Sequence, residues 1–159
     1  MEEVKHAVQD EYADDFSWCY GCGRLNENGL HVRTGWDGDK TVSYYTPRED
    51  QIAVPGVVYG GLIASIVDCH STGSASLALH RKNGHEPGSG VEPPRFVTAS
   101  LHVDYLKPTP HGVTLKLVGT VEEIHPKRFR VLTEVMANGE VCAKGDVVAV
   151  VIPDGFMDK

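Results

Sequence analysis

The chain has 159 residues, of which 41% are hydrophobic and 23% are charged, and its formal net charge is -7. Such a composition is typical of a globular protein with a single core, and the length excludes two full domains. The negative charge argues against a nucleic-acid-binding surface. The acidic N-terminus lacks the features of a signal peptide, and no apolar run reaches the length of a membrane span, so we expect a cytoplasmic protein.

Residues 1–29 are polar and punctuated by glycine, which predicts an N-terminal arm lying on a single domain of residues 30–159. In that domain, segments 30–36 and 41–46 flank an Asp-Gly pair, as in a β-hairpin with a tight turn. Apolar side chains recur at helical spacing in residues 60–79 and predict one long helix. Residues 80–95 are rich in glycine, proline and charge, and predict a flexible loop rather than a core element.

Four further segments, 96–106, 113–124, 129–137 and 141–152, have the composition and alternation of β-strands. The pair Asn138-Gly139 between the last two is a strong signal for a hairpin turn. Two strands, one helix and four strands in succession predict an α+β fold, in which the helix covers one face of a six-stranded antiparallel sheet.

Asp68 stands out because it lies inside the otherwise apolar run VPGVVYGGLIASIVDC. A carboxylate without a partner is costly to bury, so such a residue is paired, solvent-exposed or retained for chemistry. The apolar flank favours a chemical role over a solvated helix face, which is the ordinary alternative.

Three motifs resemble those of the hotdog-fold acyl-CoA thioesterases, in particular the phenylacetate-degradation type and its relatives. They are CYGCGRLNENGL, VVYGGLIASIVD and VTASLHVDYLKPTP, and the resemblance extends roughly from residue 19 to residue 152. It implies a hotdog fold, in which a curved antiparallel sheet wraps a long central helix. It also implies hydrolysis of an acyl-CoA to a free acid and CoA, by a homodimer or by a tetramer built as a dimer of dimers.

The resemblance places the Gly60 amide as the oxyanion donor, with Gly61 beside it in the substrate-binding part of the site. This role agrees with physical expectation, because the leading amides of a helix lack intrahelical partners and carry the positive end of its dipole. Two glycines there leave the backbone open to close approach by a carbonyl oxygen.

Asp68 follows Gly60 by eight residues, about 12 Å along a helix, so the two cannot readily meet the same carbonyl within one chain. Pairing two chains resolves the distance, as in the family. Asp68 is then either a general base acting on water or a nucleophile that forms an anhydride. Thr98 matches the family's hydroxyl residue, which holds the water or the carboxylate. In a strictly alternating strand, Ser100 and His102 would lie on the same face as Thr98.

Two positions depart from the family pattern. Tyr59 stands where members commonly carry histidine before the glycine pair, and Ala53 stands where some carry asparagine. A phenol can still donate a hydrogen bond, so Tyr59 stays among the candidate catalytic residues. The replacement also favours an alternative, a non-catalytic module that binds or senses acyl-CoA. Hydration of an acyl thioester is a weaker reading, because no histidine shares the helix face of Asp68.

Coenzyme A carries phosphates, and an acidic protein that binds it needs local basic groups. Lys107, Lys127 and Arg128 are candidates for this contact, with ordinary solvated charge as the alternative.

Cys19 and Cys22 form a C-x-x-C pair, but the sequence offers no second pair, so a zinc site is not predicted. A thioredoxin-like role is disfavoured because the pair does not open a helix after a strand. We expect a turn that packs the arm on the domain, and a reaction that uses no metal and no cofactor.

Overall fold

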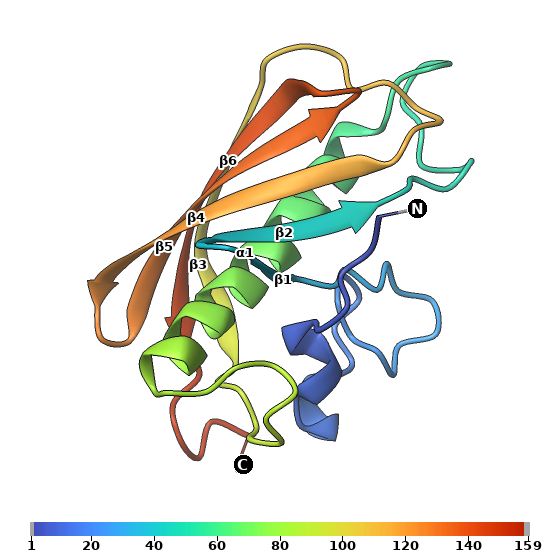
Figure 1. The fold of residues 1–159 in the computed structure, drawn as a ribbon. Coiled ribbons are helices and arrows are strands. Elements are labelled where there is room, and N and C mark those ends of the chain that lie inside the picture. Colours follow the sequence, from blue (N-terminus) through green and yellow to red (C-terminus); the bar gives the residue numbers. More distant parts are fainter. Residues whose placement is uncertain (1, 158–159) are drawn as a thin grey trace.

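The computed structural model describes residues 2–157, which fold into one long helix and one antiparallel sheet. The helix α1 spans Gly60–Lys82. The strands are β1 (Gly35–Asp37), β2 (Lys40–Tyr45), β3 (Phe96–Tyr105), β4 (Leu115–His125), β5 (Arg128–Ala137) and β6 (Glu140–Val151). Their order in the sheet is β1-β2-β4-β5-β6-β3, which leaves β1 and β3 as the edges. The predicted architecture, a hotdog fold, is confirmed: the sheet curves around α1 (Figure 1).

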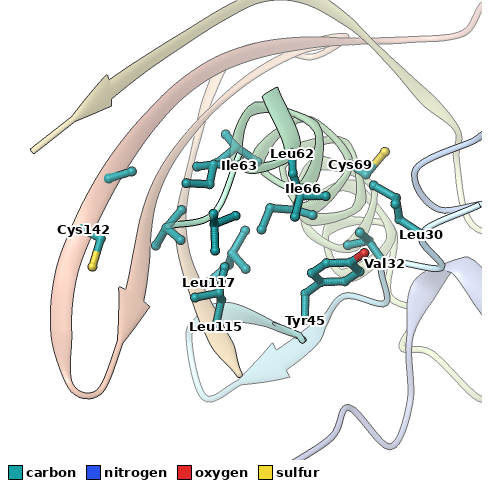
Figure 2. Packing of buried hydrophobic residues seen from close by; sticks show 14 of the residues in the cluster. Leu30, Val32, Tyr45, Leu62, Ile63, Ile66, Cys69, Leu115, Leu117 and Cys142 are labelled. Carbon is teal, nitrogen blue, oxygen red and sulfur yellow. The ribbon is translucent and has the colours of Figure 1, made fainter. Parts of the chain in front are cut away.

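The main core lies between α1 and the concave face of the sheet. Leu62, Ile63 and Ile66 of the helix face Leu115 and Leu117 of β4, as Figure 2 shows. A second cluster lies towards the other end of the helix, where the rings of Phe96 and Phe129 meet edge to face with centroids 5.4 Å apart. Burial of these side chains against the sheet stabilises a helix whose serine- and alanine-rich second half has little apolar surface of its own.

The predicted first strand was too long. Residues 30–34 do not join the sheet, because the amides of Leu30 and Val32 donate to the carbonyls of Tyr20 and Gly21 in the arm. His31 between them has a φ of 55°, which breaks an extended run. The segment therefore follows the cysteine-containing turn first and enters the sheet only at Gly35.

The predicted hairpin turn at Asn138-Gly139 is confirmed, since both residues have positive φ and Ala137 pairs with Glu140. The helix, in contrast, continues three residues beyond its predicted end, so that His80 lies buried in its last turn rather than in a loop. The loop that follows is tied down by hydrogen bonds from the Gly88 amide to Glu11 and from Ser76 Oγ to the Pro94 carbonyl.

The N-terminal residues pack against the side of α1 that the sheet leaves open (Figure 1). They include two short 3-10 helices, η1 (Val8–Glu11) and η2 (Asp14–Phe16). Gln9 is buried and exchanges hydrogen bonds with the side chain and amide of Thr34. Thr34 in turn accepts from Ser43, whose Oγ lies 2.7 Å from His70 Nδ1 on α1. A continuous buried polar network therefore joins the arm to the sheet and the helix.

No helix within residues 2–157 is both long enough and apolar enough to cross a membrane.

Candidate active site

Asp68 and Thr98 meet between the helix and an edge strand. Asp68 lies a little over two turns into α1 and is half-buried, and Thr98 lies near the start of β3. The Thr98 hydroxyl donates a hydrogen bond to Asp68 Oδ1. This pair, expected from the sequence as a carboxylate with a positioning hydroxyl, is therefore brought together within one chain.

A β-bulge in β3 decides which side chains share the face of Thr98. Thr98 pairs with Ala149 and Ser100 pairs with Val148, so Ala99 is the extra residue. Paired residues point to the same face of a sheet, and Ala149 is buried under the helix. Thr98 therefore faces α1, whereas Ser100 and His102 face away from it. The expectation that these three share a face was wrong, because strict alternation does not allow for an inserted residue.

The surroundings of Asp68 keep its carboxyl easier to protonate than a free aspartate. Burial raises the pKa of Asp68 above its ordinary value, the Thr98 hydrogen bond opposes this rise, and the nearby Cys19 adds to it. A carboxylate with a raised pKa is a stronger base once it has lost its proton, which suits proton abstraction from water.

The start of α1 offers free backbone donors. The amides of Leu62 and Ile63 donate to the Tyr59 carbonyl, but those of Gly60 and Gly61 donate to no acceptor among residues 2–157. The Tyr105 hydroxyl donates to the Gly60 carbonyl over 2.7 Å, and its ring packs against Gly60. Tyr105 thus fixes the turn that presents the two amides.

Tyr59 precedes the glycine pair, and its side chain is 56% exposed without capping the helix. Its ring lies over Gly61, so closely that a Cβ at residue 61 would stand 2.5 Å from a ring carbon. The ring forms one wall of a pocket of about 350 Å³ at the helix start, which Tyr20, Arg48 and Gln51 also line. Ala53 lies outside this pocket lining and is exposed.

The family model of the thioesterase superfamily matches residues 55–144, which include the helix and most of the sheet. The chain belongs to the thioesterase superfamily. The resemblance read from the sequence is thereby confirmed, and membership indicates hydrolysis of a thioester. Asp68, Thr98 and the Gly60-Gly61 pair all lie within the matched residues.

Solved structures of the superfamily agree with this assignment. A thioesterase superfamily protein from Shewanella loihica PV-4 is 41% identical, with a TM-score of 0.66, and the match covers 88% of this chain and 98% of that one. A putative thioesterase from Ralstonia eutropha JMP134, described as phenylacetic acid degradation-related, is 18% identical with a TM-score of 0.60. The match covers 77% of this chain and 86% of that one. A thioesterase from Haemophilus influenzae is 14% identical with a TM-score of 0.63, and the match covers 90% of this chain and 96% of that one. The Ralstonia and Haemophilus structures have low sequence identity to this chain, so they support the fold alone. Comparison with curated proteins found no match.

In this superfamily member the basic candidates do not form one cluster. Lys107 lies beside the β5–β6 hairpin and forms an ion pair with Glu140. Lys127 and Arg128 lie at the opposite end of β6, where Arg128 pairs with Val150. All three are exposed. Within residues 2–157 these three cations therefore do not form a single basic patch for phosphate, although each end of β6 offers cations.

Two features of the site were missed in the sequence. Tyr105 was part of a recognised motif, but nothing in the pattern indicated its bond to Gly60. Cys69 follows Asp68 directly, and its Sγ lies 3.7 Å from that of Cys19. The spacing of 50 residues between these cysteines carries no signal of contact, since only the packing of the arm on α1 brings them together.

Proposed function

We propose that this thioesterase superfamily protein hydrolyses acyl-CoA to a free acid and CoA. The observation that carries the proposal is the half-buried Asp68 carboxylate, held by the Thr98 hydroxyl beside the central helix. A hydrolase of this kind needs a base or nucleophile and a donor for the developing oxyanion, and the free amides of Gly60 and Gly61 supply the second requirement.

The reaction needs one water and no redox step. With Asp68 as general base, the carboxylate takes a proton from water while the oxygen attacks the thioester carbon, and the carbon–sulfur bond then breaks to release CoA thiol. With Asp68 as nucleophile, its oxygen attacks the thioester carbon and the carbon–sulfur bond breaks to expel CoA thiolate, which leaves a transient anhydride. Water then cleaves the anhydride to the free acid and the Asp68 carboxylate, and the proton released neutralises the thiolate. In both routes the Gly60 amide donates to the carbonyl oxygen, and Thr98 orients the carboxylate.

Gly60 and Asp68 lie about 12 Å apart along one helix, so the proposed site needs both from different protomers. The edge strand β3 is the surface we propose for pairing, because a strand edge presents unpaired backbone groups. Val97, Leu101 and Tyr105 on this strand are between 41% and 52% exposed in the single chain. A homodimer, or a tetramer formed from two dimers, would cover them and bring the Gly60 end of one helix towards Asp68 of the other.

The CoA part of the substrate is proposed to contact Lys107 from one end of the sheet and Lys127 and Arg128 from the other. Phosphates bind such exposed cations through charge-assisted hydrogen bonds. Lys107 would exchange its bond to Glu140 for one to a phosphate.

The test is release of free thiol from short, medium, long and aromatic acyl-CoAs, with the matching N-acetylcysteamine thioesters run in parallel. Wild type is compared with Asp68→Asn and with Asp104→Asn, a control on an exposed carboxylate of β3, the strand that carries Thr98. We expect Asp68→Asn to lose about a hundredfold or more in kcat, because it preserves shape and removes the base, while Asp104→Asn keeps its rate. Circular dichroism and light scattering verify that each variant is folded and assembled.

Equal turnover in Asp68→Asn would remove Asp68 from the mechanism. Equal rates on CoA and N-acetylcysteamine thioesters would mean that CoA itself is not recognised.

The second candidate is a module that binds acyl-CoA without cleaving it. The observation favouring it is the Tyr59 ring, which covers Gly61 at the helix start. Saturable acyl-CoA binding measured by calorimetry, with no thiol release from any substrate, would establish this alternative over the hydrolase.

A further inference from the structure

Three of the four cysteines gather where the N-terminal arm meets the central helix. Cys19, Cys22 and Cys69 place their sulfurs within 4.8 Å of one another, and all are free thiols. Cys22 and Cys69 are buried, whereas Cys19 is partly exposed. In Figure 2 the sulfur of Cys69 points away from Leu115 and Leu117.

We propose that Cys19, Cys22 and Cys69 bind one zinc ion as three thiolate ligands. Zinc is held by thiolates at about 2.3 Å, so two sulfurs of a tetrahedral site lie about 3.8 Å apart. The Cys19–Cys69 separation of 3.7 Å already has this value. Cys22 needs only a small shift, since it lies within 4.8 Å of both.

The backbone around the C-x-x-C pair is shaped for a third sulfur. A Cβ on residue 21 would lie 2.1 Å from the Sγ of Cys69, so a side chain at Gly21 would expel that thiol. The Gly23 amide donates to the Cys19 carbonyl over 2.7 Å and closes a tight turn around the C-x-x-C pair.

The local charges also balance. One Zn²⁺ and three thiolates carry a net charge of about -1. Arg95 supplies the compensating positive charge, because its Nη2 lies 3.8 Å from Cys22 Sγ. Two further contacts hold the guanidinium in place: Nη1 donates to the Phe96 carbonyl, and the group lies over the Tyr12 ring.

No fourth His, Cys, Asp or Glu joins the cluster within residues 2–157, which leaves the fourth position to solvent on the side of the partly exposed Cys19. The proposed ion would cross-link the arm to α1 at the residue after Asp68. Its role is thus to hold the helix and arm together beside the candidate active site. Zinc uptake is independent of thioester hydrolysis, so either proposal can fail alone.

The test is zinc binding by the full chain under reducing conditions, measured by competition with a chromophoric chelator. Wild type is compared with Cys22→Ser, Cys69→Ser and Cys142→Ser, the last a buried cysteine outside the cluster. We expect one zinc per chain for wild type and Cys142→Ser. Cys22→Ser and Cys69→Ser should each bind zinc at least about a hundredfold more weakly than wild type, because each loses a direct ligand. Loss of an outer-shell partner has a smaller effect.

Cobalt substitution gives a second readout that does not depend on affinity. Thiolate-to-cobalt charge-transfer absorption should appear in wild type and fall to about two thirds in Cys22→Ser and Cys69→Ser, because two of three thiolates remain.

Lack of zinc uptake by reduced wild type would overturn the proposal, as would equal affinity in Cys69→Ser and Cys142→Ser. Formation of a Cys19–Cys69 disulfide with peroxide, in a protein that takes up no zinc when reduced, would identify the cluster as a redox pair instead.

Discussion

At the scale of single residues, the geometry of the candidate site depends on the direction in which one hydroxyl points. The bulge at Ala99 turns Thr98 towards α1, where it meets Asp68, and turns the next hydroxyl, that of Ser100, away. Bulges commonly re-aim a side chain next to active sites. The Asp68 carboxylate is half-buried, so its orientation rests on this single side-chain hydrogen bond among residues 2–157.

Replacing Thr98 by valine should therefore lower kcat by about tenfold to a hundredfold, because the shape is kept while the carboxylate loses its orientation. Thr98→Ser, which retains the hydroxyl, is the matched control and should keep most of the rate. Steady-state thiol release checks both variants. If Thr98→Val were as active as Thr98→Ser, the hydrogen bond would have no part in turnover.

At the scale of elements, the close approach of α1 to the sheet depends on small residues of the sheet as well as of the helix. Gly145 of β6 lies directly under Val67, so a Cβ at residue 145 would stand 2.4 Å from Val67 Cγ1. Asp68 is the next residue along the helix, so this contact also sets the height of the carboxylate above the sheet.

Gly145→Ala should lower the free energy of unfolding by about 1–3 kcal/mol, since the added methyl forces the helix away from β6. The variant Val67→Ala leaves a cavity and is itself destabilised, but the double variant should lose less than the sum of the two, because the second change makes room for the first. Urea denaturation of the four proteins measures this coupling. Strict additivity would mean that the contact between Gly145 and Val67 does not limit the packing.

At the scale of the whole molecule, the single chain holds both parts of the proposed site but keeps them apart. The free amides at the helix start and the Asp68–Thr98 pair are separated along α1, and the edge strand β3 carries exposed apolar side chains. Lys107 and the pair Lys127 and Arg128 are likewise separated by the length of β6. Assembly of two copies through β3 would place these separated groups together.

Leu101→Glu should accordingly give monomers and remove turnover, because the charge lies on the proposed pairing strand. The matched control is Leu132→Glu on β5, which is similarly exposed but lies in the interior of the sheet rather than at its edge. Light scattering coupled to size exclusion gives the mass, and thiol release gives the rate. A dimer that persists in Leu101→Glu would exclude β3 as the interface.

The sequence by itself determined the order of the elements and singled out the candidate residues for the chemistry. Helical spacing located α1, turn residues located the hairpins, and an apolar flank singled out Asp68, because each of these signals lies within a short stretch of chain. Tertiary structure decided what depends on distant partners. The arm's amide bonds shortened the first strand, the bulge selected Thr98 over Ser100, and packing of the arm on α1 brought Cys69 to Cys19 and Cys22. Contacts across 50 residues leave no periodic trace in a sequence, so only the folded chain reveals them.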